Sequence, residues 1–215
     1  MMREDYLPGT PYTILQNPQL YQMNSDSELL GQFIRVRHDD HVLDIGCGSG
    51  VLMLYALQQK PASVCGIDLF PEITEAARIN IERNGLEAEL YTGRVQDFVH
   101  ERFDLIICNP PYFSNPNPQL HSESKYIDAA RHDTHLTIEE LFAAVSRLLK
   151  QKGRFAVVYR PEGMNRIMHA AYSQGMCPAV IQPVRDIKKN KIRTVLMEYV
   201  FGTNRDTEFR IPLEI

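Results

Sequence analysis

The sequence predicts an α/β fold in which helices cover both faces of a mostly parallel β-sheet, and three observations support this prediction. First, short apolar runs of strand length recur along the chain, at residues 41–45, 63–67, 87–91, 103–108 and 154–159. Second, segments with helical periodicity lie between these runs. Third, the two kinds of segment alternate, which is typical of parallel strands joined by right-handed helical crossovers.

Two of the intervening segments have well-marked helix boundaries. Residues 71–84 begin with proline, repeat small and apolar side chains at helical spacing, and are followed by Gly85. Residues 137–150 begin with Thr-Ile-Glu-Glu, a capping box in which Glu140 can accept a hydrogen bond from the backbone of Thr137. Each segment is therefore expected to form an amphipathic helix that packs on the sheet.

The two ends of the chain depart from this alternation. Residues 180–201 contain two apolar segments joined by a charged loop, which predicts an antiparallel hairpin at one edge of the sheet. Near the N-terminus, YTILQ and LYQM flank an Asn-Pro-Gln sequence and predict a second hairpin. A helix is expected to follow, with Ser25 and Glu28 forming another capping box.

Length and composition indicate a globular protein. A chain of 215 residues with 44% hydrophobic and 23% charged residues is long enough to bury a core. We expect one domain over residues 1–215, with an N-terminal hairpin-like extension at 1–24 and a core at 25–215. No apolar run reaches the length of a membrane span and the N-terminus has no signal-peptide core, so we expect a cytoplasmic protein without a membrane partner. The four cysteines are scattered without a CxxC pair, which favours reduced thiols over disulfides.

The charge is distributed unevenly along the chain. The net charge is −4, but residues 1–149 hold 11 basic and 21 acidic residues, whereas residues 150–215 hold 12 and 6. Such an asymmetry indicates a surface that faces nucleic acid. A solvated basic face is the other interpretation, and the charge alone favours it.

A glycine-rich turn follows the first apolar run. Its sequence, LDIGCGSG, places Gly46, Gly48 and Gly50 where a strand must turn into a helix, and glycine lets a ligand approach the backbone closely. A tight turn without a ligand would also use glycine. Asp44, however, stands two residues before the first glycine, and its carboxylate favours a ligand with an ammonium or sulfonium group over a pyrophosphate.

Two further carboxylates follow the next two strands. Asp68 ends the second apolar run, where an acid can bind a ribose diol. Asp97 and its neighbour Phe98 follow the third run, where they could contact an adenine ring. Each acid alone could be a surface or capping residue. Three acids after three successive strands, however, predict a ligand site at the edge where open α/β sheets bind ligands.

In the order of these motifs, over residues 25–160, the sequence resembles the class I S-adenosylmethionine-dependent methyltransferases. The resemblance implies a Rossmann-like fold with a mostly parallel seven-stranded sheet, an antiparallel C-terminal strand, and S-adenosylmethionine as the cofactor. It also implies that the glycine turn holds the methionine part of the cofactor. The cofactor-binding residues expected on this basis are Asp44, Gly46, Cys47, Gly48, Gly50, Asp68, Leu69, Asp97, Phe98 and Asn109.

The sequence CNPPYFSN follows the fourth strand, beside the expected cofactor. The side chain of Asn109 and the backbone carbonyl of Pro110 offer two acceptors that can converge on one NH2 group, while prolines stiffen the segment. Tyr112 and Phe113 offer flat surfaces on which a planar group can stack. When two acceptors bind the hydrogens of a planar amine, they localise the nitrogen lone pair toward a methyl donor. Catalysis can then consist of alignment and electrostatics. A rigid turn covering the end of the sheet is the alternative.

This motif narrows the resemblance to methyltransferases that act on amino groups. Three groups share an Asn/Asp-Pro-Pro-aromatic motif: adenine-N6 enzymes acting on DNA or RNA, guanine-N2 enzymes acting on ribosomal RNA, and glutamine-N5 enzymes acting on peptide release factors. The sequence shows neither the N-terminal helical bundle of the release-factor enzymes nor the duplicated domain of some guanine enzymes. A resemblance to small bacterial tRNA adenine-N6 methyltransferases that act beside the anticodon of a valine tRNA is carried by residues 21–34, 109–113, 130–141 and 157–164.

This resemblance implies an enzyme that methylates an anticodon-loop adenine, with RNA as its partner, present as a monomer or weak homodimer. A glutamine-N5 enzyme, a guanine-N2 enzyme and a non-catalytic RNA assembly factor are the alternatives. The expected catalytic residues are Asn109, Pro110 and Tyr112. The expected substrate-binding residues are Pro111, Phe113, Arg131, His132, Arg160, Lys188, Lys189 and Lys191. No metal is expected, because the histidines of ARHDTH lack a third ligand at suitable spacing.

Overall fold

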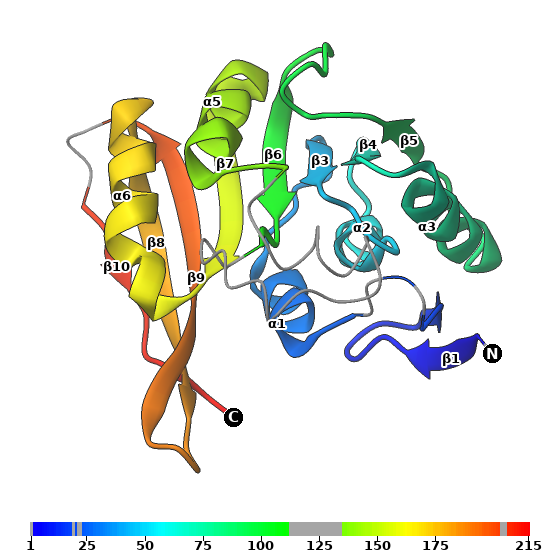
Figure 1. Cartoon of the computed structure of the whole chain (residues 1–215), viewed down its shortest axis with the longest axis horizontal. Coiled ribbons are helices and arrows are strands. Elements are labelled where there is room, and N and C mark those ends of the chain that lie inside the picture. The colour runs from blue at the N-terminus through cyan, green and yellow to red at the C-terminus, as the bar shows by residue number, and fades with distance from the viewer. Residues whose placement is uncertain (1, 19, 21–22, 112–134, 203–205) are drawn as a thin grey trace.

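The centre of the protein is a nine-stranded sheet with helices on both faces (Figure 1). A computed structural model describes residues 2–18, 20, 23–111, 135–202 and 206–215. The strand order is β10-β8-β9-β7-β6-β3-β4-β5, with β11 also paired to β8. The strands are β3 (His41–Ile45), β4 (Ser63–Asp68), β5 (Glu89–Thr92), β6 (Phe103–Cys108), β7 (Leu149–Tyr159), β8 (Met176–Asp186), β9 (Lys191–Phe201), β10 (Glu208–Phe209) and β11 (Leu213–Glu214).

Most neighbouring strands run parallel. β5, β4, β3, β6 and β7 form a continuous parallel sheet, and β9 lies antiparallel between β7 and β8. The α/β fold and the antiparallel C-terminal hairpin are therefore confirmed, although the hairpin lies beside the edge of the sheet and does not form it. Two short strands, β10 and β11, add to β8 beyond the seven that were expected.

The helices divide between the two faces of the sheet, and each group covers its own cluster of buried side chains. Leu43 and Ile45 point to one cluster and Val42 to the other, as the two-residue period of a strand requires. The strands are apolar on both faces for this reason. α1 (Ser25–Phe33), α2 (Val51–Gln58) and α3 (Pro71–Arg83) cover one face, while α5 (Ile138–Leu148) and α6 (Met164–Ser173), which follows the short 3-10 helix η2 (Pro161–Gly163), cover the other.

The capping box predicted at the start of α5 is confirmed. The hydroxyl of Thr137 accepts a hydrogen bond from the Glu140 amide at 3.2 Å, and the Glu140 carboxylate accepts one from the Thr137 amide at 2.8 Å. The helix ends at Leu148, two residues earlier than predicted. It ends there because the chain continues directly into β7 at Leu149.

The capping box predicted at Ser25 is wrong. The N-cap of α1 is Asn24, whose Oδ1 accepts hydrogen bonds from the amides of Asp26 at 3.1 Å and Ser27 at 2.9 Å. Asparagine is as favourable an N-cap as serine and stands one position earlier in the chain. Ser25 and Glu28 therefore both lie within the helix.

The N-terminal hairpin pairs a different segment from the one predicted, and residues 21–22 of the predicted second segment lie outside the described residues. The strands that pair, antiparallel, are β1 (Arg3–Tyr6) and β2 (Thr13–Gln16). The hairpin docks on α3 through two asparagine side chains. Asn80 bonds the N–H of Leu15 at 2.7 Å and its carbonyl at 3.2 Å, and Asn84 bonds the N–H of Thr13 at 3.1 Å and its carbonyl at 2.8 Å. Asn80 also donates to the Ser49 carbonyl in the glycine turn at 2.9 Å, so α3 joins the hairpin to that turn.

The β8–β9 hairpin extends beyond the end of β7 (Figure 1). Tyr159, the last residue of β7, pairs with Val195, so residues 191–194 of β9 continue past it. On the outer side of β8, the amide of Ile187 donates to the carbonyl of Ile215 at 3.1 Å. The turn of this hairpin therefore lies on the side of the molecule where the parallel strands end.

Replacing Thr137 with Ala should lower the free energy of unfolding by about 1 kcal/mol, because the Glu140 amide loses the acceptor that caps it. Thr137→Ser keeps a hydroxyl at the same position and should retain most of the stability. Unfolding in urea measures both variants. An alanine variant as stable as the wild type would contradict a stabilising role for this cap.

Candidate active site

The carboxyl ends of three neighbouring strands meet at one edge of the sheet. Ile45, the last residue of β3, pairs with Ile67 of β4 on one side and with Cys108 of β6 on the other. The residues that follow these three are Gly46, Asp68 and Asn109. They therefore lie in a row, at the edge where open α/β sheets bind ligands.

The glycine-rich turn joins β3 to α2. The amides of Gly46 and Cys47 donate to the Ile67 carbonyl at 2.9 and 3.1 Å, which holds the turn against β4. Gly46 has a φ of +70°, and a Cβ atom at this position would meet nothing within 4 Å, so its backbone is open to a ligand. Gly50, with a φ of +86°, is the N-cap of α2 and lies against Ala77 of α3.

Asp68 links the end of β4 to the glycine turn. Its Oδ2 accepts the N–H of Gly48 at 3.1 Å, and its Oδ1 accepts the N–H of Phe70 at 3.3 Å. Burial raises the pKa of this carboxyl, while the hydrogen bonds from the Gly48, Phe70 and Leu69 amides oppose the rise. A carboxylate has about four acceptor positions, so Asp68 can receive further donors.

Asp44 lies in β3 just before the glycine turn. Its side chain is fully buried, and among the described residues neither carboxylate oxygen has a hydrogen-bond partner. Burial, and to a smaller extent the charge of Asp68, raises the pKa of Asp44 well above its usual value. Because an unpartnered buried carboxylate is costly, its presence beside an open backbone turn calls for a functional explanation.

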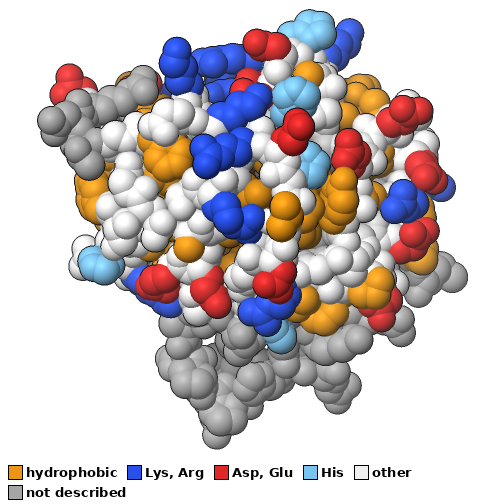
Figure 2. Space-filling view, turned by 90° about the horizontal axis from the view of Figure 1, so that it is seen from above, with side chains coloured by type: hydrophobic (Ala, Val, Ile, Leu, Met, Phe, Trp, Pro, Cys, Tyr) orange, Lys and Arg blue, Asp and Glu red, His pale blue; other side chains and the backbone are white. Residues whose placement is uncertain are grey.

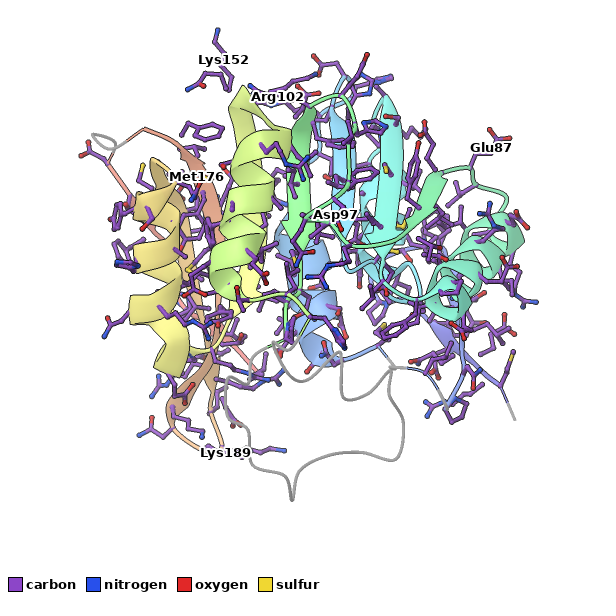
Figure 3. The ribbon with its side chains drawn as sticks, turned by 45° about the horizontal axis from the view of Figure 1, so that its top comes forward. Glu87, Asp97, Arg102, Lys152, Met176 and Lys189 are labelled. Carbon is purple, nitrogen blue, oxygen red and sulfur yellow. The ribbon has the colours of Figure 1, made fainter. Side chains whose placement is uncertain are left out.

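The loop after β5 brings different residues to the site from those predicted. Val95 and Gln96 face this edge of the sheet, whereas Asp97, labelled in Figure 3, is exposed and Phe98 is buried in the core. Arg147 of α5 holds the loop by donating to the backbone carbonyls of Val95 at 2.9 Å and Gln96 at 3.2 Å. No local sequence signal reveals this arrangement, because the arginine lies 52 residues after Val95.

Asn109 stands immediately after β6 and is held by the start of α1. Its Nδ2 donates to the Ser27 hydroxyl at 2.8 Å and to Asn24 Oδ1 at 3.3 Å. Pro110 is buried and Pro111 is half-buried. The contact of Asn24 and Ser27 with Asn109 was not predicted from the sequence.

Two adjoining hollows lie over this edge of the sheet, with volumes of about 150 and 40 Å³, and three residues line both: Gly46, Gly48 and Asn109. The larger hollow is also lined by Asp68, Leu69, Phe70, Val95, Gln96 and Pro111. The smaller is also lined by Met23, Ser27, Cys47, Ser49, Val51 and Leu52. The structure thus gathers most of the expected cofactor residues around these two adjoining hollows. The expected cofactor residues that line neither hollow are Asp44, Gly50, Asp97 and Phe98.

The remaining residues expected to be catalytic or to bind the substrate lie in several places. Those outside the described residues are Tyr112, Phe113, Arg131 and His132. Arg160 is bound to Asp26 of α1, with 2.8 Å between Nη2 and Oδ2. The exposed residues at the turn of the β8–β9 hairpin are Lys188, Lys189 and Lys191, of which Lys189 is labelled in Figure 3.

Comparison with known proteins identifies the family. The profile of the methyltransferase small domain matches residues 13–179. The chain belongs to this methyltransferase family. Among the relatives of this methyltransferase, a protein from Cytophaga hutchinsonii named tRNA1(Val) (adenine(37)-N6)-methyltransferase is 30% identical over 214 residues, which cover 96% of this chain and 86% of the relative. The resemblance stated from the sequence is confirmed.

Solved methyltransferase structures share the fold. A methyltransferase from Pyrococcus furiosus has a TM-score of 0.67 and 20% identity, covering 91% of this chain and 92% of that one. The 16S rRNA N2 G1207 methyltransferase of T. thermophilus, solved in complex with AdoMet and guanosine, has a TM-score of 0.65 and 18% identity, covering 94% of this chain and 50% of that one. The expected Rossmann-like class I methyltransferase fold is confirmed.

The raised pKa of Asp44 predicts how the stability of the methyltransferase depends on pH. An aspartate in an unfolded chain titrates near 4, and in the folded protein the pKa of Asp44 is higher, so folding binds a proton between the two values. The free energy of unfolding should therefore fall as the pH rises from about 4 through the raised pKa. Asp68 contributes with the same sign.

Asp44→Asn removes the buried charge and should make the protein more stable than the wild type at about pH 7, with a smaller advantage at about pH 4.5. Each tenfold rise in the proton affinity of Asp44 on folding corresponds to about 1.4 kcal/mol of free energy of unfolding, which the charged carboxylate loses at about pH 7. The neutral amide of the asparagine variant, if it has no hydrogen-bond partner, costs about 1–3 kcal/mol at any pH. Unfolding in urea across this pH range, without added ligand, measures the difference. A stability difference that does not change with pH would contradict the prediction.

Proposed function

We propose that this methyltransferase transfers a methyl group from S-adenosylmethionine to the N6 amino group of an adenine in the anticodon loop of a tRNA. The observation that carries the proposal is Asn109, whose amide is held beside the glycine turn with its nitrogen bonded to the start of α1. The substrate is supported by the name of the Cytophaga relative and by those of further relatives, which are tRNA1(Val) (adenine(37)-N6)-methyltransferases.

The residues around the two hollows fit S-adenosylmethionine. The open backbone at Gly46 admits the methionine part, and Asp68 can accept hydrogen bonds from ribose hydroxyls. Val95 and Gln96 would hold the adenine, in the place that the sequence suggested for Asp97 and Phe98. The unpartnered carboxylate of Asp44 favours a cationic ligand nearby. When bound, the cofactor supplies a methyl group on a positively charged sulfur, which is already activated for attack by an amine.

The acceptors of the Asn-Pro-Pro segment would then act on the target amine. Because the Nδ2 of Asn109 faces Ser27, its Oδ1 is directed away from α1 and can accept one N–H of the substrate. The backbone carbonyl of Pro110 can accept the other. Both acceptors are fixed before the substrate arrives, so they localise the nitrogen lone pair without a reorganisation cost. Stacking of the base on Tyr112 and Phe113, and contacts from Arg131 and His132, are proposed from the sequence alone.

The β8–β9 hairpin is proposed as a contact for RNA phosphates. Lys188, Lys189 and Lys191 are exposed at its turn, on the side of the molecule where the parallel strands end. A target base must leave its stack to reach Asn109, which costs least in an unpaired loop. On the face seen from above, by contrast, lysines and arginines are interspersed with acidic and histidine side chains (Figure 2).

We further propose that residues 1–215 form one domain that acts in the cytoplasm as a monomer or weak homodimer. Docking of the N-terminal hairpin on α3 through Asn80 and Asn84 supports a single domain. Within the described ranges, no helix is long and apolar enough to cross a membrane.

Methyl transfer from tritiated S-adenosylmethionine tests the function, with bulk tRNA, ribosomal RNA and peptide release factor offered as separate acceptors. Label is expected in tRNA, as N6-methyladenosine after nuclease digestion. Asn109→Ala should slow this transfer by about 100-fold or more, because a preorganised polar contact is lost. Cofactor affinity measured by calorimetry should fall by much less, because Asn109 is only one of the many residues that line the two hollows.

Three outcomes would contradict the proposal. Label only in release factor would indicate a glutamine enzyme, and label only in ribosomal RNA guanosine would indicate a guanine enzyme. Absence of label from every acceptor, with RNA binding retained, would indicate a non-catalytic assembly factor.

Replacing Lys188 and Lys189 together with Ala should weaken tRNA binding without changing cofactor affinity. The slope of log K against log salt concentration should become shallower by about 1 to 2, because two phosphate contacts are lost. The matched control replaces Arg102 and Lys152, an exposed basic pair at the opposite end of the molecule (Figure 3). An equal loss in the control, or no loss in the hairpin variant, would contradict an RNA contact at this turn.

A further inference from the structure

The N-cap of α1 determines which way the Asn109 amide points. Asn24 Oδ1 accepts the amides of Asp26 and Ser27, so this oxygen faces the start of the helix. An amide oxygen can only accept hydrogen bonds, and Asn109 must therefore present its NH2 group to it. The Ser27 hydroxyl, which also accepts a hydrogen bond from Asn109 Nδ2, could act as donor or acceptor. Among the described partners of Asn109, it is therefore Asn24 that sets the direction of the amide.

The start of α1 is in turn held by a buried carboxylate. The side chain of Asp26 is 2% exposed, and its two oxygens accept hydrogen bonds from Arg160 at 2.8 Å and Arg193 at 2.7 Å. Arg160 follows β7 and Arg193 lies in β9. Arg160 also donates to the Arg193 carbonyl at 3.1 Å, and Arg193 donates to the Ser25 hydroxyl. Asp26 thus ties the first turn of α1 to the ends of two strands.

The direction of the Asn109 amide matters for the chemistry. If the amide turned by 180°, its NH2 group would face the N–H groups of the target amine. Two hydrogen-bond donors cannot bond to each other, so the amine would lose this acceptor. Charge-assisted bonds from two guanidinium groups hold the turn that contains Asn24 in one arrangement. Loss of the Asp26 charge would leave Arg160 and Arg193 repelling each other beneath that turn.

We propose that Asn24 and Asp26 are positioning residues for methyl transfer. Asn24 sets the direction of the Asn109 amide, and Asp26, through Arg160 and Arg193, holds Asn24 in place. The inference rests on the proposed function of Asn109 as the acceptor for the target amine. It also gives Arg160 an indirect role in place of the direct substrate contact expected from the sequence.

The first test observes the amide itself. In the ¹⁵N–¹H spectrum of the whole protein, the side-chain NH2 of Asn109 is identified by its disappearance in Asn109→Asp. In Asn24→Ala and Asp26→Asn, this signal should broaden or move toward the position of a solvated amide. Asn24→Asp keeps an oxygen that caps the helix and accepts from Nδ2, so its signal should stay close to that of the wild type.

The second test measures single-turnover methyl transfer to tRNA. Asn24→Ala and Asp26→Asn should reduce the rate by about 10- to 100-fold, as expected when a reacting group is misaligned, while the Kd values for cofactor and tRNA change little. Asn24 lines neither hollow, which is why binding should persist. Asn24→Asp should restore most of the rate.

The matched control is Asp40→Asn, which breaks another buried aspartate–arginine pair. Asp40 is 5% exposed and lies 2.5 Å from Arg154, just before the start of β3 and away from the site. Its substitution should lower stability, as Asp26→Asn should, but leave the Asn109 signal and the transfer rate unchanged. An equal fall in rate would assign the effect of Asp26 to stability and overturn the inference.

The proposed function and the positioning role of Asn24 and Asp26 are contradicted by different results. If the wild type labels none of the acceptors, the proposed function is wrong and the role in methyl transfer falls with it, whereas the Asn109 amide signal still decides whether Asn24 and Asp26 set the direction of the amide. If the wild type labels tRNA and Asn24→Ala keeps both the signal and the rate, the positioning role alone is wrong.

Discussion

Everything at the site depends on the register of one central strand. Because β3 is paired on both sides in parallel, its last residue Ile45 is level with Ile67 and with Cys108. The three loops that follow therefore start at the same height and can surround a single ligand. A shift of one residue in either pairing would turn a buried strand face toward the opposite helices and move one loop out of the site.

Side chains from distant elements then complete what the register begins. Arg147 of α5 holds the loop after β5 by its carbonyls, and Asn80 of α3 holds the glycine turn through Ser49. Asn24 does the same for Asn109. Asp44, in contrast, lowers the stability of the fold, because no described group compensates its buried carboxylate. Sites that keep such groups commonly trade stability for function.

The parts that the sequence predicts well are those with local causes. The apolar period locates the strands, Thr137 and Glu140 mark a helix start, and the glycines mark the turn after β3. The parts that it misses depend on pairing between distant segments. The N-terminal strands are too short for their pattern to identify the partner, and docking on α3 decides it. Likewise, an aromatic side chain such as that of Phe98 could stack on adenine. Arg147, however, holds the loop by the Phe98 carbonyl, and the Phe98 side chain packs in the core.

The docking of β2 on α3 has a consequence for the behaviour of the protein in concentrated solution. The outer edge of a two-stranded hairpin normally presents unpaired N–H and C=O groups, on which a strand of another chain can assemble. Here the side chains of Asn80 and Asn84 bond both backbone groups of Leu15 and of Thr13. Two amides on a helix thus substitute for a neighbouring strand, and they shield this edge against aggregation without adding another strand to the hairpin.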